Sequence, residues 1–128
     1  MTHVVDTCGW ISYFQRDSNA DFFGTVIEQT DALLVPSIVV YEVSKKILLM
    51  YEQNVYLQAM RYLKLGQFVG VDWDLMIEAA AASKRYQLHM ADAIIWQTAQ
   101  SHNALLYTQD AAFQGLPGVV YRAKSSIV

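Results

Sequence analysis

The chain has 128 residues, of which 54% are hydrophobic and 16% are charged, and its formal net charge is −3. This composition predicts one compact domain over residues 1–128, and it excludes a disordered chain and a basic surface that would hold nucleic acid by charge alone. A single cysteine excludes an intramolecular disulfide framework and a cysteine-based zinc site.

Five short apolar or β-branched runs predict strands, at residues 3–5, 32–36, 68–71, 104–108 and 118–122. The stretches between them have helical spacing and predict helices at 8–16, 19–30, 37–53, 55–65, 74–87 and 90–102. We expect Ser37 and Asp74 to cap two of these helices. The spacing between 74 and 102 does not distinguish one helix from two. Strands that alternate with helices favour an α/β domain with a mainly parallel central sheet flanked by helices.

The start of the chain and its longest apolar run bear on the compartment. The opening sequence, MTHVVDTCGW, lacks the charged and apolar regions of a signal peptide. The longest apolar run, residues 32–41, is interrupted by Pro36 and Ser37 and is shorter than the roughly 20 residues that span a bilayer. We therefore expect a cytoplasmic protein with no membrane segment.

Four acidic residues lie where such a sheet would gather them. Ligands of parallel α/β sheets bind outside the carboxyl ends of the strands. Asp6 follows the first predicted strand, Asp110 follows the fourth, and Glu42 lies on the helix after the second. Asp92 lies on an otherwise apolar helix face, where an unpaired carboxylate would cost several kcal/mol. If a helix begins near His89, Asp92 lies in its first turn and faces the same edge of the sheet.

Three of the four acids also have a simpler interpretation when each is taken alone. Asp6 and Asp110 would serve as helix caps, and Glu42 would pair with Lys45 or Lys46 at helical spacing. One shared cause explains all four together, because gathered carboxylates repel one another unless a cation compensates them. Oxygen ligands without cysteine or paired histidine suit Mg²⁺ or Mn²⁺. Such an ion activates water and neutralises phosphate charge, so we expect phosphodiester hydrolysis.

Four segments carry motifs in a consistent order: VVDTCGWISYF, VPSIVVYEVSKKI, YQLHMADAIIWQTAQSHNALLYTQDAAF and LPGVVY. They resemble the PIN domain family, in particular the small VapC-type toxins of toxin–antitoxin pairs, over nearly the whole chain. The most specific part is ADAIIWQTAQSHNALLYTQDAAF, in which an Asp opens a helix and an apolar strand ends in T-x-D before a Phe.

The resemblance implies a PIN-like fold and an acidic pocket of Asp6, Glu42, Asp92 and Asp110, with Asp6 and Asp92 as the most direct metal ligands. Thr108 would match the hydroxyl at the strand end, which orients a carboxylate or water. The resemblance also implies a helix break near His89 and a Mg²⁺-dependent endoribonuclease, commonly a homodimer. A small antitoxin would inhibit it, through a segment that lies over the pocket or over a neighbouring helical groove.

The sequence departs from the family at Cys8, where a small polar Ser or Asn is usual, and at His89, where Ser or Thr often caps the helix. We assign no catalytic role to His89 and interpret it as a cap or surface residue. Three basic residues near the acids are candidates for contacts with RNA phosphates: Lys45, Lys46 and Arg85. The alternative interpretation is that they belong to solvated helix faces without a role in binding. The aromatic residues Trp10, Tyr13 and Phe14 are interpreted as core or dimer-interface residues before base-stacking ones.

Three alternatives remain beside the ribonuclease. A phosphoryl-receiver domain would carry paired acids after the first strand, but Asp6 is single, and Lys124 follows the fifth strand only beyond Arg122. A catalytically idle PIN-like module would bind RNA or protein, although all four acids are present. A nuclease of the same fold that acts on DNA is not separated from the ribonuclease by the sequence.

Overall fold

The computed structural model describes residues 1–124, so the last four residues of the predicted domain, 125–128, lie outside the described part. The strands of the described part are β1 (His3–Val5), β2 (Leu33–Pro36), β3 (Gln67–Val69), β4 (Leu105–Thr108) and β5 (Val119–Tyr121). Its helices are α1 (Thr7–Gln15), α2 (Ala20–Ile27), α3 (Ser37–Met50), α4 (Gln53–Leu63), α5 (Trp73–Tyr86) and α6 (Met90–Ser101), with short 3₁₀ turns η1 (Thr30–Ala32) and η2 (Ala111–Phe113). Each predicted strand is therefore present.

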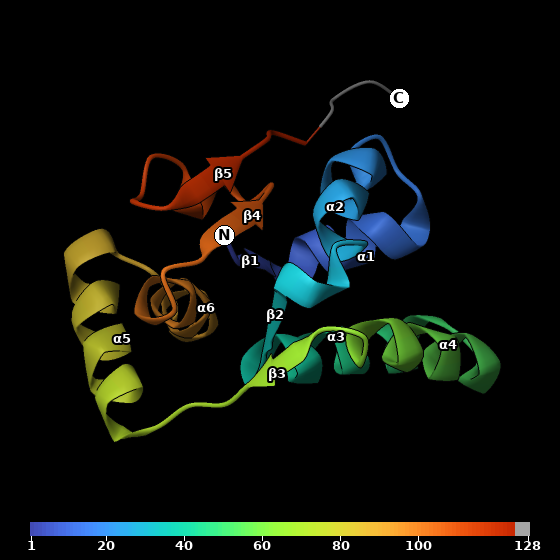
Figure 1. Ribbon diagram of the computed structural model, residues 1–128, viewed down its shortest axis with the longest axis horizontal. Coiled ribbons are helices and arrows are strands. Elements are labelled where there is room, and N and C mark those ends of the chain that lie inside the picture. Colours follow the sequence, from blue (N-terminus) through green and yellow to red (C-terminus); the bar gives the residue numbers. More distant parts are fainter. Residues whose placement is uncertain (125–128) are drawn as a thin grey trace.

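The strands form one sheet in the order β3-β2-β1-β4-β5, and each neighbouring pair is parallel. This confirms the predicted α/β class. The chain winds from β1 through β2 to β3 in one direction and then crosses to β4 and β5 in the other. Right-handed crossovers consequently place α1 to α4 on one face and α5 and α6 on the opposite face (Figure 1). The winding reverses between β1 and β4, and the crevice at such a reversal is the usual ligand site of this architecture.

The core lies on both faces of the sheet, which explains why the central strands are continuous apolar runs. Val4 and Val5 are fully buried, and all four residues of β2 are buried. Trp10 is also fully buried, whereas Tyr13 and Phe14 are partly buried against the core. The first helix therefore uses these aromatic residues largely for packing, as predicted.

Two predicted helix caps and several predicted helix boundaries were wrong. Asp72, not Asp74, caps α5, since its Oδ1 accepts the backbone N–H of Leu75 at 2.9 Å. The N-cap of α3 is Pro36 without a side-chain bond, so Ser37 is the first helical residue and not the cap. The helix predicted over 19–30 ends at Ile27 and is followed by η1.

The region from 74 to 102 contains two helices. Gln87 ends α5 in the left-handed conformation (φ 58°), and α6 begins at Met90 with His89 as its N-cap. The break near His89 that the resemblance implied is therefore present. The His89 side chain is exposed and makes no capping bond, in agreement with a surface residue. In the described part of the chain, the helices are too short or too polar to cross a membrane.

Candidate active site

Asp6 lies at the carboxyl end of β1 and is also the N-cap of α1. Its Oδ1 accepts the backbone N–H of Thr7 at 2.7 Å, as a capping carboxylate does. Its Oδ2 accepts the Thr108 hydroxyl at 2.8 Å and the Cys8 thiol at 3.2 Å. The side chain is only 4% exposed, so burial raises the pKa of Asp6 while these three hydrogen bonds lower it. Asp6 is thus a helix cap and a member of a larger polar cluster at once.

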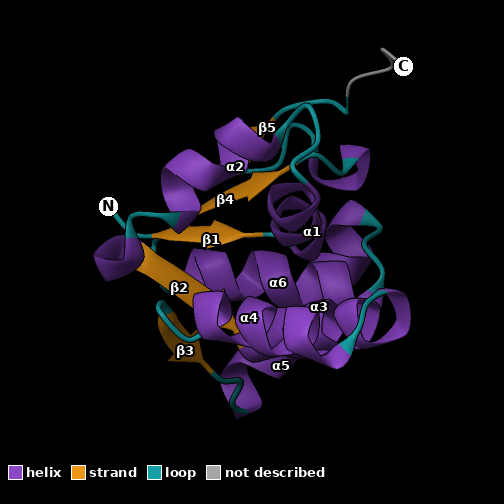
Figure 2. Cartoon of the chain, turned by 90° about the vertical axis from the view of Figure 1, so that its right-hand side faces the viewer, coloured by secondary structure: helices purple, strands orange, loops and turns teal. Residues whose placement is uncertain are grey.

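Thr108 joins the ends of the two central strands. Val5 of β1 is in register with Tyr107 of β4, so Asp6 and Thr108 are at the same level of the sheet, where the arrowheads of β1 and β4 lie side by side and point toward α1 (Figure 2). The Thr108 hydroxyl donates to Asp6 and accepts the backbone N–H of Asp110 at 2.9 Å. This one hydroxyl therefore orients a carboxylate on β1 and the start of the turn after β4.

Asp110 lies in the turn between β4 and η2. Its Oδ1 accepts the backbone N–H of Ala112 at 2.9 Å, so it caps η2 as the simpler interpretation predicted. Its charge also raises the pKa values of Asp6 and Asp92. Asp110 can therefore serve as a helix cap and as a member of the cluster, because the capping bond uses only one of its two carboxylate oxygens.

Glu42 reaches the site from α3. Its Oε1 accepts the Thr7 hydroxyl at 2.6 Å, across the contact between α1 and α3. Thr7 is a site residue that the sequence analysis did not single out, although it directly follows Asp6. The signal for it was a hydroxyl residue at the first position of a helix, where the backbone holds the side chain next to the cap.

Asp92 lies in the first turn of α6 and is half-buried. Its pKa is raised to about 6, first by burial and then by the charges of Asp6, Asp110 and Glu42, with a smaller opposing effect of His89. This explains why a carboxylate lies on an apolar helix face, since the helix directs it toward the other acids at the carboxyl edge of the sheet. Asp6, Glu42, Asp92 and Asp110 are called the acid cluster below.

Cys8 takes part in the site even though it departs from the family pattern. Its Sγ is 3.2 Å from Asp6 Oδ2 and 3.6 Å from Thr108 Oγ1. Burial and then the Asp6 charge raise the pKa of the thiol to about 12, so it remains a hydrogen-bond donor at neutral pH. The thiol consequently donates to Asp6 Oδ2 at the position where the sequence departs from the expected Ser or Asn.

The chemistry of the acid cluster fits a divalent cation. Its donors are carboxylate oxygens, which Mg²⁺ and Mn²⁺ prefer, and the acids repel one another in a way that a cation would compensate. Within residues 1–124, no three His, Cys, Asp and Glu side chains form a group that would hold a metal ion as they stand. The fit to a divalent cation therefore rests on the chemistry of the donors and on their mutual repulsion.

The basic residues predicted to contact RNA are all exposed: Lys45, Lys46 and Arg85. Lys45 and Lys46 lie on α3, one turn beyond Glu42. Arg85 lies in the last turn of α5, where its guanidinium is 5.2 Å from the centre of the Tyr86 ring. Their contact with a substrate stays a prediction.

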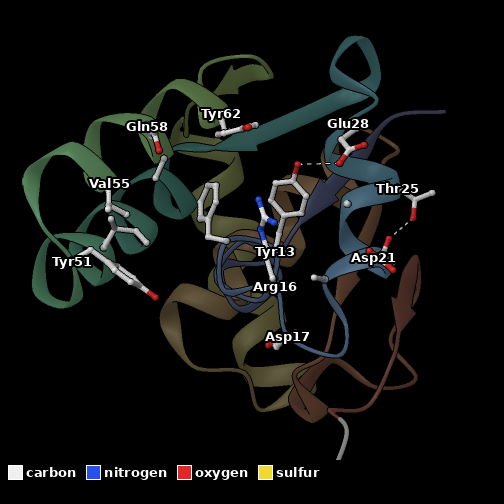
Figure 3. Close-up of a pocket in the computed structure, with 15 residues that line it drawn as sticks. Tyr13, Arg16, Asp17, Asp21, Thr25, Glu28, Tyr51, Val55, Gln58 and Tyr62 are labelled. Carbon is white, nitrogen blue, oxygen red and sulfur yellow. Dashed lines mark hydrogen bonds between the residues drawn. The ribbon is translucent and has the colours of Figure 1, made fainter.

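A groove of about 900 Å³ lies apart from the acid cluster, and the sequence analysis did not locate it. Side chains of α1 and α2 face those of α4 across it (Figure 3). Its apolar lining includes Phe14, Ile47 and Ala59, whereas Asp17, Asp21 and Glu28 border it from the side of α2. Tyr13 donates to Glu28 at 3.0 Å and packs edge-on against Tyr62. This is called the helical groove below.

Solved structures share this fold over nearly the whole chain. A toxin–antitoxin complex from Klebsiella pneumoniae matches with a TM-score of 0.80 at 24% identity, covering 93% of this chain and 96% of that one. VapBC2 from Rickettsia felis, bound to a DNA fragment of its promoter, matches with a TM-score of 0.76 at 12% identity (98% and 100% covered). DNA-bound VapBC from Salmonella typhimurium has a TM-score of 0.72 at 14% identity (96% and 98% covered). Comparison with curated proteins gave no match.

An all-parallel sheet flanked by helices defines the class, namely an α/β domain whose candidate site lies at the carboxyl ends of β1 and β4. The family model of the PIN domain matches residues 3–119. The chain belongs to the PIN domain family.

Proposed function

We propose that this protein is a metal-dependent endoribonuclease of the VapC type and the toxin of a toxin–antitoxin pair. The observation that carries the proposal is the acid cluster. Burial, together with the charges of the three other acids, raises the pKa of Asp92 to about 6. Membership of the PIN family and the shared fold with solved toxin–antitoxin complexes support it. A cytoplasmic protein remains our expectation, because the proposed substrate is RNA.

In this proposal Asp6 and Asp92 hold a divalent cation, Mg²⁺ or Mn²⁺, and Glu42 and Asp110 complete the site or orient water. A bound cation would supply charge neutralisation at the phosphate and a more acidic water. The chain's own contribution is orientation: Thr108 and Cys8 fix one oxygen of Asp6, and Thr7 fixes Glu42. These contacts would hold the carboxylates in place before substrate arrives.

The RNA backbone would be bound beside the cluster by the exposed cations Lys45, Lys46 and Arg85. The net charge of −3 makes such local cations and the metal necessary for binding a polyanion. DNA as the substrate, and an idle module that only binds RNA or protein, are the two alternatives that the experiment below separates.

We propose that the antitoxin partner binds in the helical groove. The groove contains apolar side chains, and it is bordered by three acids, Asp17, Asp21 and Glu28, and by one cation, Arg16. A segment with apolar side chains on one face and Lys or Arg at its edge would match both features. A reverse-charge variant, Glu28→Lys, is expected to weaken binding of the antitoxin in a pull-down and to leave metal binding unchanged.

The proposed homodimer would form at the exposed apolar stretch around edge strand β3 and the start of α5. Large apolar residues of this stretch are exposed: Leu65, Phe68, Val71, Trp73, Met76 and Ile77. Trp73 is 85% exposed, which is typical of an interface and unusual for a monomer surface. Sedimentation velocity of Trp73→Lys/Ile77→Lys beside the wild type tests this, and a wild-type monomer would contradict it.

The first test of the nuclease is cleavage of structured RNA and of DNA by purified protein with Mg²⁺, Mn²⁺ or EDTA. Asp92→Asn is the test variant, and Asp74→Asn, at an exposed acid in the first turn of α5, is the matched control. We expect metal-dependent RNA cleavage that the control retains and Asp92→Asn loses. Cleavage of DNA alone would change the substrate, and equal cleavage by Asp92→Asn would refute the site. Absence of cleavage with Mn²⁺ bound would favour the idle module.

A further inference from the structure

Asn19 occupies the N-cap of α2, yet its side chain makes no capping hydrogen bond. Asparagine is favoured at this position because its side-chain oxygen can accept an N–H of the first turn. Here Asp17 Oδ1 instead accepts the backbone N–H of Asn19 at 3.0 Å. The Asn19 side chain is only 5% exposed, so its burial requires a cause other than capping.

The Asn19 amide bonds to segments that are far away in the sequence. Its Nδ2 donates to Gln109 Oε1 at 2.9 Å and to the carbonyl oxygen of Ala123 at 3.1 Å. Gln109 is 8% exposed, and its Nε2 lies 3.5 Å from the carbonyl oxygen of Cys8. Breaking the hydrogen bond between Asn19 and Gln109 would leave buried polar atoms of both amides without partners. The amide bridge between Asn19 and Gln109 therefore joins the α1–α2 loop, the turn after β4 and the segment after β5.

Gln109 stands between two groups of the site. Thr108 before it bonds Asp6, and Asp110 after it belongs to the acid cluster. Side chains alternate along extended backbone, so the Gln109 side chain anchors this segment from the side opposite to its two neighbours. The amide bridge thereby fixes the backbone that presents Thr108 and Asp110, without itself reaching the cluster.

We propose that Asn19 and Gln109 are positioning residues of the active site, whose amide bridge sets the distance of Asp110 from Asp6 and Asp92. This rests on the proposed metal-dependent function. The bridge joins Asn19 and Gln109, which are 90 residues apart in the sequence, and it acts on metal and substrate only through the turn that carries Asp110.

The test measures Mn²⁺ affinity by electron paramagnetic resonance and RNA cleavage as separate kcat and KM. The variants are Asn19→Ala, Gln109→Met and the double variant, each checked for folding by circular dichroism. Gln109→Met keeps the volume and removes the polar atoms, so it serves even if Asn19→Ala does not fold. Thr25→Ala is the matched control, because the exposed Thr25 hydroxyl on α2 bonds only carbonyl oxygens of its own helix and does not touch the amide bridge.

We expect each single variant to weaken Mn²⁺ binding about tenfold or more, the usual effect of losing an outer contact of a metal ligand. We expect kcat to fall with KM unchanged, and the double variant to lose less than the product of the single losses because both break the same bond. Wild-type Mn²⁺ affinity in the single variants, or an equal loss in Thr25→Ala, overturns the inference alone. A wild type whose Mn²⁺ binding does not depend on Asp92 overturns the proposed function and this inference with it.

Discussion

Replacing Asp92 with asparagine is expected to stabilise the protein at neutral pH while it removes the proposed activity. The pKa of Asp92 rises from 3.8 to about 6 on folding, so the charged form is disfavoured in the native state. At about 1.36 kcal/mol per pKa unit this rise corresponds to roughly 3 kcal/mol, and solvent screening at a half-buried group reduces it to about 1–2 kcal/mol. Asparagine has a similar shape and carries no charge, so Asp92→Asn avoids this cost.

The pH dependence gives the sign of the effect. Below pH 3.8 Asp92 is protonated in both the folded and the unfolded chain, and it imposes no penalty. Between about pH 4 and 6 the native state binds more protons than the unfolded state, so this group lowers stability as pH rises. Above about pH 6 the penalty is complete. The advantage of Asp92→Asn should therefore be largest at pH 7.5 and should shrink toward pH 4.

Urea unfolding followed by tryptophan fluorescence at pH 4.5 and 7.5 measures this difference. Asp74→Asn is the control, and as a surface change it should stay within about 0.5 kcal/mol of the wild type. With Mg²⁺ present at pH 7.5, the wild type should become more stable than Asp92→Asn, because the ion stabilises the native form that binds it. The reasoning is refuted if Asp92→Asn is no more stable than the wild type at pH 7.5, or if its advantage is the same at both pH values.

Three further changes test the contacts around the acid cluster. Thr108→Val removes the donor to Asp6 and the acceptor for the Asp110 N–H, and should lower Mn²⁺ affinity about 10- to 100-fold in a titration; an unchanged affinity would refute its orienting role. Cys8→Ser keeps a donor to Asp6 and should retain cleavage within a few-fold, whereas Cys8→Ala should lose about tenfold; equal rates for both would show that the donor is irrelevant. Gly9→Ala would place a methyl 2.6 Å from the Phe23 and Val5 side chains, and should lower the free energy of unfolding by about 1–3 kcal/mol in urea; wild-type stability would contradict the packing at α1.

The gathering of the acids could be predicted because it follows from topology. The carboxyl ends of parallel strands share one edge, so an Asp directly after β1 and another just after β4 were expected to meet. Asp92 was expected there because its helix face is otherwise apolar. The predicted roles of these acids in catalysis stay predictions until cleavage is measured.

Local patterns were less informative where two neighbouring residues compete for one position. Asp72 and Asp74 are both capable N-caps, and only the structure shows that Asp72 accepts the Leu75 N–H and that α5 begins at Trp73. The spacing of apolar residues also did not decide whether the helix is interrupted between α5 and α6, just before His89. Gln87 adopts a left-handed conformation there without any glycine to mark it.

The sequence by itself determined the strands and the sheet class, because burial on both faces of a parallel sheet requires continuous apolar runs, and a run of this kind is visible in a single chain. Only the tertiary structure decided the contacts that hold the site. The Thr108–Asp6 bond joins residues 102 positions apart, Thr7 meets Glu42 across 35, and Asn19 meets Gln109 across 90. A hydrogen bond requires a donor and an acceptor within about 3 Å, and no periodicity in the sequence encodes a distance between segments so far apart.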